Sequence, residues 1–268
     1  MNVVPLADAR DEAVFGGKAA QLAAALHAGL PVPPGAALPS SLVEAVAAGE
    51  AAGATALEAV AALVTCPVAV RSSAIGEDSA TASFAGQHVT QLNVTEADKL
   101  AEAVVAVWAS ARSDAALAYR ARLGIDGSPS TGVVVQRLLD PEVAGVVFTR
   151  NPLDGSDERM VEASWGLGEA VVAGRVIPDR FRIARDGTIL ERTTGWKPVA
   201  LRPSPLGGTV EMPVDADLVE SLCLDDARLG ELNELAAHCE RTFGDGRDLE
   251  WALAGGTLYL LQCRAVTR

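Results

Sequence analysis

The sequence predicts an α+β fold, because helical and strand-like patterns are mixed without a regular order along its 268 residues. A doubly wound parallel sheet would instead require strands and helices in regular alternation. Hydrophobic residues make up 49% of the chain and charged residues 21%, which excludes a disordered or fibrous protein. Aromatic residues are 4%, so we expect a core built mainly from Ala, Val and Leu.

Helical patterns are strongest in the first half of the chain. The segment Lys18–Gly29 is rich in Ala and Leu and ends at a glycine just before a proline, as helices often do. Residues 40–63 are Ala-rich and predicted to be helical, with Gly49 and Gly53 as weak interruptions. A long amphipathic helix is expected over about residues 96–123.

Outside these helical segments, most of the predicted elements are strands. The segment LPVPPGAALP is expected to be an extended turn region, because its prolines cannot continue a helix. Two further helical stretches are expected between Asp217 and Phe243. Short apolar runs bounded by turn residues predict strands at residues 67–71, 132–139, 144–149, 160–164, 180–184, 248–254 and 257–264.

The charge balance and the cysteines limit the expected partners and compartment. Acidic residues outnumber basic ones by 35 to 22, for a formal net charge of −13. Nucleic acid and anionic membranes both favour basic surface, so we expect neither as a main partner. The four cysteines follow no CxxC spacing, and the N-terminus lacks a basic start followed by an apolar run. We therefore expect a soluble cytoplasmic protein with reduced thiols and without a membrane span.

Two segments with small residues could contact phosphate. The tripeptide Gly16-Gly17-Lys18 opens a helix, where backbone N–H groups and a lysine can face an anion, although it lacks the P-loop pattern. Arg71 ends a strand and is followed by SSAIGEDSATASFAGQ, which suits a flexible cover over a triphosphate. The alternatives are a simple hinge for the first segment and a solvent-exposed loop for the second, and spacing alone favours them.

The C-terminal hairpin is predicted to gather polar side chains on one face. With a three-residue loop at 255–257, Glu250 lies opposite Gln262 and Asp248 lies opposite Arg264. The other face is then continuously apolar and consists of Leu249, Trp251, Leu253, Tyr259, Leu261 and Cys263. A two-residue loop would move Gln262 and Arg264 to this apolar face, so we expect the longer loop.

The polar face of this hairpin suits a metal and a phosphate. Glu and Gln provide the oxygen ligands that Mg²⁺ prefers, and an arginine binds phosphate oxygens. An ordinary solvated face with a cross-strand ion pair remains the alternative. The three histidines, His27, His88 and His238, form no Ser/His/Asp arrangement and no HExxH zinc motif.

Five segments in order resemble one family. They are GGKAAQL with GLPVPPG, VAVRSSAIGEDSATASFAGQ, VVVQRLLDPEVAGVVFTRNP, VEASWGLGEAVVAGRVIPDR and DLEWALAGGTLYLLQCR, and they extend from Gly16 to Arg264. Together they resemble the N-terminal ATP-binding domain of the pyruvate phosphate dikinase and phosphoenolpyruvate synthase family, which is similar to a domain of rifampicin phosphotransferases. Departures are GGKAAQL where GGKGANL is usual, Ala265 where proline is usual, and a shorter region between Gly35 and Cys66.

The resemblance implies an ATP-grasp fold, in which two lobes hold MgATP between them. Residues 1–268 are then expected to be a single domain of this type, with neither a phosphohistidine domain nor a phosphoenolpyruvate/pyruvate barrel domain. Carried over by position, Glu250 and Gln262 face the magnesium ion. The other implied ligands of ATP are Lys18 and Arg71 on the phosphates, Gly86 and Thr90 in the loop over the triphosphate, Gln136 near the adenine, and Arg264 on phosphate. Lys18, Arg71 and Arg264 are the implied catalytic residues.

The resemblance also implies a reaction. The family passes the β-phosphoryl group of ATP to a histidine on a swivelling domain and releases AMP. None of the three histidines here has the family's phosphohistidine context, so we expect that histidine on a separate domain or protein. The alternatives are a non-catalytic, regulatory ATP-binding module and an ATP-grasp ligase that releases ADP.

Overall fold

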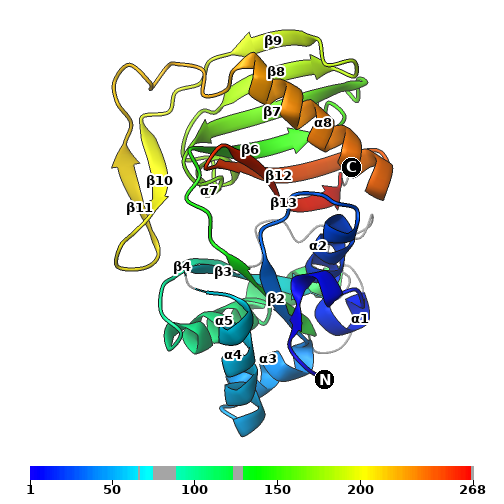
Figure 1. Ribbon diagram of the computed structural model, residues 1–268, viewed down its shortest axis with the longest axis vertical. Helices are drawn as coiled ribbons and strands as arrows, with labels where there is room; N and C mark the ends of the chain where they lie inside the picture. Colours follow the sequence, from blue (N-terminus) through cyan, green and yellow to red (C-terminus); the bar gives the residue numbers. More distant parts are fainter. Residues whose placement is uncertain (66, 75–88, 123–128, 267–268) are drawn as a thin grey trace.

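The computed structural model describes residues 1–65, 67–74, 89–122 and 129–266, and it has two lobes (Figure 1). Each lobe is built around one sheet, and residues 138–141 connect the two sheets. The first lobe comprises the described residues up to 137, and the second comprises residues 142–265. This mixed architecture confirms the predicted α+β class and the two-lobed arrangement of the ATP-grasp fold.

The first lobe has a five-stranded sheet in the order β1-β2-β5-β3-β4. Its strands are β1 (Val4–Pro5), β2 (Gly35–Leu38), β5 (Thr131–Arg137), β3 (Val68–Ala74) and β4 (Thr90–Val94). Its helices are the 3-10 helix η1 (Leu6–Asp8), α1 (Glu12–Phe15), α2 (Gly17–His27), α3 (Ser40–Ala47), α4 (Ala51–Leu63), α5 (Lys99–Ser110) and α6 (Asp114–Arg122). Val and Leu side chains of α3, α4 and α5 pack against one face of the sheet and form a separate core there.

The second lobe has a six-stranded antiparallel sheet in the order β13-β12-β6-β7-β8-β9. Its strands are β6 (Val143–Phe148), β7 (Glu158–Trp165), β8 (Asp179–Ala184), β9 (Ile189–Thr193), β12 (Arg247–Ala254) and β13 (Thr257–Ala265). Helix α8 (Asp226–Phe243) covers one face, and the short helix α7 (Glu169–Val172) follows β7. A separate hairpin of β10 (Val199–Pro203) and β11 (Thr209–Pro213) projects along the side of the molecule in Figure 1.

The two lobes share a hydrophobic core on one side. Leu22 of α2 belongs to the same buried cluster as Trp251 of β12 and Leu260 of β13. Figure 1 shows α2 beside β13, on the side of the molecule away from the β10–β11 hairpin. The lobes are therefore held together by apolar packing at this edge.

Several predicted elements differ from the observed ones. The helix expected over 96–123 is two helices, because Ser113 accepts a hydrogen bond from the backbone of Ala116 and caps a new start. The helix expected over 40–63 breaks at Gly49, and its two parts are bent by 116°. Between Asp217 and Phe243 there is one helix, which starts at the Asp225 cap. The LPVPPGAALP segment contains strand β2, because its backbone pairs with β5.

Within the described ranges, no single helix is both long enough and apolar enough to cross a membrane. Helices α3 and α4 reach the required length and apolar composition only when they are taken together, and they are bent relative to each other by 116°.

The hairpin turn was predicted wrongly, yet the predicted pairs of polar residues are present. The turn has two residues, because Ala254 pairs with Thr257. A β-bulge at Leu261 then shifts the register, so that Glu250 pairs with Gln262 and Asp248 with Arg264. The bulge also removes Tyr259 and Leu261 from the predicted apolar face, where Leu260 is buried instead.

Candidate functional site

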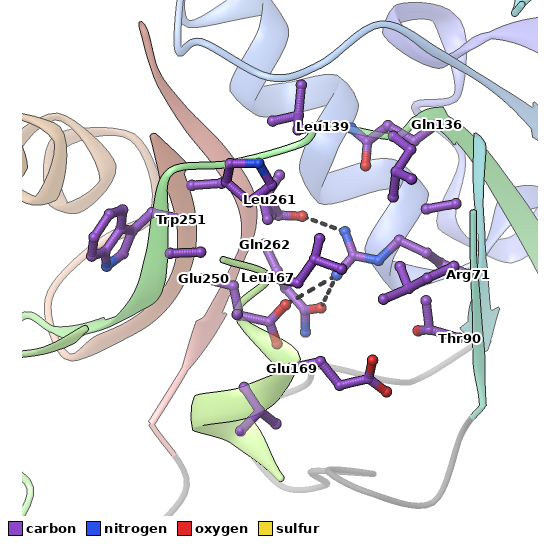
Figure 2. A pocket seen from close by; sticks show the side chains of 18 of the residues that line it. Arg71, Thr90, Gln136, Leu139, Leu167, Glu169, Glu250, Trp251, Leu261 and Gln262 are labelled. Carbon is purple, nitrogen blue, oxygen red and sulfur yellow. Dashed lines mark hydrogen bonds and ion pairs between the residues drawn. The ribbon is translucent and has the colours of Figure 1, made fainter. Parts of the chain in front are cut away.

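A pocket of about 400 Å³ lies between the two lobes (Figure 2). It is lined by β3, β4, β5 and the start of α2 from the first lobe, and by β12, β13 and α7 from the second. The structure brings together seven of the eight residues predicted as ligands: Lys18, Arg71, Thr90, Gln136, Glu250, Gln262 and Arg264. The eighth, Gly86, lies outside the described residues.

Lys18 enters the pocket from the first turn of α2. Its side chain is buried, and its Nζ donates a hydrogen bond of 2.9 Å to the backbone oxygen of Ser72 on β3. The next residue, Ala19, donates its backbone N–H to Ser73 Oγ at 3.0 Å. These contacts dock the helix start on β3, and they direct the lysine to the same strand that carries Arg71.

Arg71 connects the two lobes across the pocket. It is 8% exposed on β3, and Figure 2 shows it reaching to the C-terminal hairpin. Its Nη1 donates to the Leu261 backbone oxygen at 2.5 Å, and its Nη2 donates to Glu250 Oε2 at 3.2 Å and Gln262 Oε1 at 2.9 Å. The bulge at Leu261 therefore has a role, since it exposes a carbonyl to this arginine.

Glu250 and Gln262 present two oxygen atoms to one point. Both oxygens lie within hydrogen-bond distance of the same Arg71 nitrogen, because the two residues are cross-strand partners. Two such oxygens, completed by phosphate and water, fit the hard coordination that Mg²⁺ prefers. The described residues hold no cluster of three His, Cys, Asp or Glu side chains suited to a metal, so a cation here would also need ligands from a bound phosphate.

Arg264 is held by Asp248. Its Nε donates to Asp248 Oδ2 at 2.8 Å, and its Nη2 lies 2.6 Å from the same oxygen. Burial raises the pKa of the Asp248 carboxyl, and the neighbouring Arg264 charge partly opposes this shift. The aspartate thus orients the guanidinium at the pocket wall.

Gln136 and Thr90 lie on two other strands of the first lobe. Gln136 on β5 is 2% exposed, and its Nε2 donates to the Pro33 backbone oxygen at 2.9 Å. Thr90 is an exposed residue at the start of β4 and pairs with Arg71 in the sheet. Gln136 lies just before residues 138–141, which connect the two lobes. Residues 137–139 line the pocket next to it.

The sequence interpretation missed the apolar walls and one carboxylate of the pocket. Leu92 and Leu167 line it from opposite lobes, and Glu169 directs its carboxylate into it from α7 in Figure 2. The WGLGE segment was the available signal, because two glycines around a leucine directly precede an acidic residue and a helix. Periodicity could not show that this turn faces a strand of the other lobe.

Comparison with known proteins identifies the family. Residues 38–268 match the family described as "Pyruvate phosphate dikinase, AMP/ATP-binding domain". Lys18 precedes the matched range, so this match does not include it. A rifampicin phosphotransferase of Bacillus subtilis is 37% identical over 201 residues, which cover 74% of this chain and 23% of that protein. A probable phosphoenolpyruvate synthase of Methanothermobacter thermautotrophicus is 40% identical over 202 residues, or 75% of this chain and 29% of that protein.

Solved structures offer remoter likenesses. The D-Ala:D-Ser ligase of Enterococcus faecalis has a TM-score of 0.44 at 11% identity, covering 94% of this chain and 52% of that one. An L-amino acid ligase of Bacillus licheniformis has a TM-score of 0.42 at 14% identity, covering 94% and 43%. The chain spans less than a third of the length of the curated relatives named above. Because the family model matches residues 38–268, the chain belongs to the pyruvate phosphate dikinase family of AMP/ATP-binding domains.

Proposed function

We propose that the pocket between the lobes binds MgATP and prepares its β-phosphoryl group for transfer. The observation that carries this proposal is the meeting, around one pocket of about 400 Å³, of seven residues that the sequence resemblance implies as ligands of MgATP. These residues come from six different elements of both lobes, so their convergence is a property of the fold. A pocket of this size matches a ligand as large as a nucleotide.

The charges of the pocket suit a triphosphate. Lys18, Arg71 and Arg264 line it, although the whole chain has a formal net charge of −13. Their positive charge stabilises the phosphate oxygens and the charge that develops during transfer. The apolar walls formed by Leu92 and Leu167 suit the flat face of a base.

Mg²⁺ would be held by Glu250 and Gln262 and would supply charge neutralisation of the phosphates. Without nucleotide, Arg71 donates to both of these oxygens. A phosphate oxygen gives the Arg71 guanidinium a new partner, which frees the carboxylate and the amide oxygen for the metal. Binding of nucleotide and metal is therefore expected to be coupled at this arginine.

We propose that the acceptor of the phosphoryl group is a histidine from another domain or protein. Among the described residues, no histidine lines the pocket. His27 lies at the end of α2 beside Arg10, and His238 lies on α8 in a separate groove. His88 lies outside the described residues. The family resemblance supports attack of this histidine on the β-phosphorus of ATP, so that the bond to the α-phosphate oxygen breaks and AMP leaves. The γ-phosphoryl group stays on the transferred β-phosphate until water or another acceptor removes it. Lys18, Arg71 and Arg264 would orient the transferring group.

The nucleotide site is tested by combining a metal change with a residue change. Wild-type chain is titrated with ATP by calorimetry, with Mg²⁺ and with EDTA, and the same is done for Glu250→Gln. Mg²⁺ should tighten ATP binding in the wild type by about tenfold or more, and this gain should vanish in the variant. Glu162→Gln is the control, because Glu162 pairs with Arg180 at the surface of the same lobe. If Mg²⁺ tightened ATP binding equally in the wild type and in Glu250→Gln, the assignment of Glu250 would be contradicted.

The reaction type is tested by the product. The chain is mixed with radiolabelled ATP and a separately produced phosphohistidine domain of a related phosphotransferase. AMP together with a phosphorylated histidine supports the proposal, whereas ADP indicates a ligase. ATP binding without phosphorylation of any such domain favours a regulatory module.

A further inference from the structure

Asn93 on β4 has an unusual backbone conformation. Its φ of +59° makes it the single non-glycine residue with positive φ in the described ranges. Residues with side chains adopt this region at an energetic cost, and asparagine is among the few that tolerate it. Such a conformation persists where the surrounding structure holds it in place. Asn93 is 3% exposed, so its surroundings are protein.

The Asn93 amide holds the turn of the β10–β11 hairpin. Its Nδ2 donates to the backbone oxygens of Ser204 and Gly208, each at 2.7 Å. The backbone oxygen of Asn93 accepts a third hydrogen bond, of 3.1 Å, from the Gly208 N–H. We name these three bonds between Asn93 and residues 204–208 the Asn93 clasp. They join a strand of the first lobe to a hairpin of the second lobe.

The clasp lies directly beside the pocket wall. Leu92, the residue before Asn93, lines the pocket and packs on a small cluster formed by Leu167 and Leu201 of the second lobe. Thr90 lies on the same strand and also lines the pocket. In Figure 1 the hairpin descends to β4, on the side opposite the shared core of α2 and β13. One edge of the lobe interface is thus closed by the shared core, and the other by the Asn93 clasp together with the packing of Leu92.

We propose that Asn93 is a positioning residue for the nucleotide. The clasp holds β4 against the second lobe, and it thereby sets the distance of Leu92 and Thr90 from the α7 side of the pocket. This inference rests on the proposed binding of ATP. When the clasp is lost, the lobes separate more often at this edge, and the closed pocket is populated for a smaller fraction of the time. Apparent ATP affinity falls by that fraction, through faster dissociation.

Two substitutions separate the amide from the backbone conformation. Asn93→Gly accepts the positive φ and removes both donated bonds, so this variant is expected to fold. Asn93→Asp keeps the side-chain shape but replaces the Nδ2 donor by a carboxylate oxygen, which then faces the two carbonyl oxygens of Ser204 and Gly208. Leu206→Ala is the matched control, because Leu206 lies in the same turn, is 96% exposed and takes no part in the Asn93 clasp.

The experiment measures the dissociation of methylanthraniloyl-ATP by stopped flow, together with amide exchange of residues 90–94 and 199–213. We expect dissociation to be about tenfold faster in both Asn93 variants, with faster exchange in both segments and no change in Leu206→Ala. Unchanged dissociation in folded Asn93→Gly and Asn93→Asp overturns the inference, even if exchange increases, because the clasp is then merely structural. If the wild type itself binds no nucleotide, the proposed function fails, and that result is distinct from equal binding by wild type and variants.

Discussion

At the scale of the residue, Gly16 shows how closely the pocket depends on backbone contact. Its φ is +85°, and a Cβ atom added there would lie 1.9 Å from the backbone oxygen of Ser73. This close approach lets α2 start against β3, where Lys18 donates to Ser72. A side chain at position 16 would therefore push the helix start, and the lysine with it, away from the pocket.

Gly16 and Gly29 have similar positive φ values but different surroundings, so alanine at each position tests the contact with Ser73. Gly16→Ala should lower the free energy of unfolding by about 3 kcal/mol or more, because it combines a positive φ with a backbone clash. Gly29→Ala should cost about 1 kcal/mol, since Gly29 has a φ of +78° but no atom within 4 Å of the added Cβ. Urea unfolding measures both values. Equal losses would show that the contact with Ser73 contributes nothing.

At the scale of the element, the β7–β8 pair contains a carboxylate that depends strongly on its partners. Glu158 accepts hydrogen bonds from Asn151 at 2.7 Å and from Arg182 at 2.7 and 2.9 Å. The hydrogen bonds from Arg182 and Asn151 lower the pKa of Glu158 to about 2, from an ordinary value of 4.5. Because the folded pKa is the lower one, this carboxylate stabilises the fold above pH 4.5 and loses that effect as the pH falls towards 2.

The corresponding prediction concerns acid unfolding. Glu158→Gln should lower the melting temperature at pH 7 by about 3 °C, and the difference from wild type should shrink as the pH falls from 4.5 to 2. Thermal melts across this range test it. Glu231→Gln is the control, since Glu231 forms an exposed pair with Arg228 within α8. A difference that is constant with pH would exclude the ionised Glu158 as its cause.

The hairpin β12–β13 shows which parts of an element are readable from sequence. Alternation of polar and apolar residues correctly indicated that Glu250 faces Gln262 and that Asp248 faces Arg264. It could not locate the bulge at Leu261, because a two-residue turn with a bulge and a three-residue turn produce the same pairs beyond it. Edge strands such as β9 and β11 were missed because most of their residues are exposed and carry little apolar signal.

At the scale of the whole molecule, the shared core, the Asn93 clasp and Arg71 are among the features that join the lobes. The first two lie at opposite edges of the interface, and Arg71 crosses the pocket between the lobes. A bound ligand can displace Arg71 from two of its three partners, since the Glu250 and Gln262 oxygens are those proposed for metal binding. The lobes are therefore expected to respond to nucleotide mainly around this arginine.

This leads to a prediction for the protein without nucleotide. Arg71→Met should accelerate amide exchange in β13 near Leu261 by about tenfold, because three hydrogen bonds to a charged donor are lost. The radius of gyration from X-ray scattering should increase as the lobes separate. Arg192→Met, which removes an exposed pair with Asp226 inside the second lobe, should change neither quantity. A compact variant with wild-type exchange would mean that Arg71 does not hold the lobes.

By itself the sequence determined the local features of this protein: the helix that presents Lys18, the strand that carries Arg71, the polar face of the last hairpin, and the family. It placed the end of that strand at Arg71, whereas β3 continues to Ala74. These features depend on composition and spacing within one segment, which periodicity reports directly. Tertiary structure alone decided that Leu92 faces Leu167, that Glu169 enters the pocket, and that the Asn93 amide clasps a hairpin more than a hundred residues away. Such contacts depend on which elements meet in space, and a pattern of apolar residues shows which face of an element is buried but not what covers it.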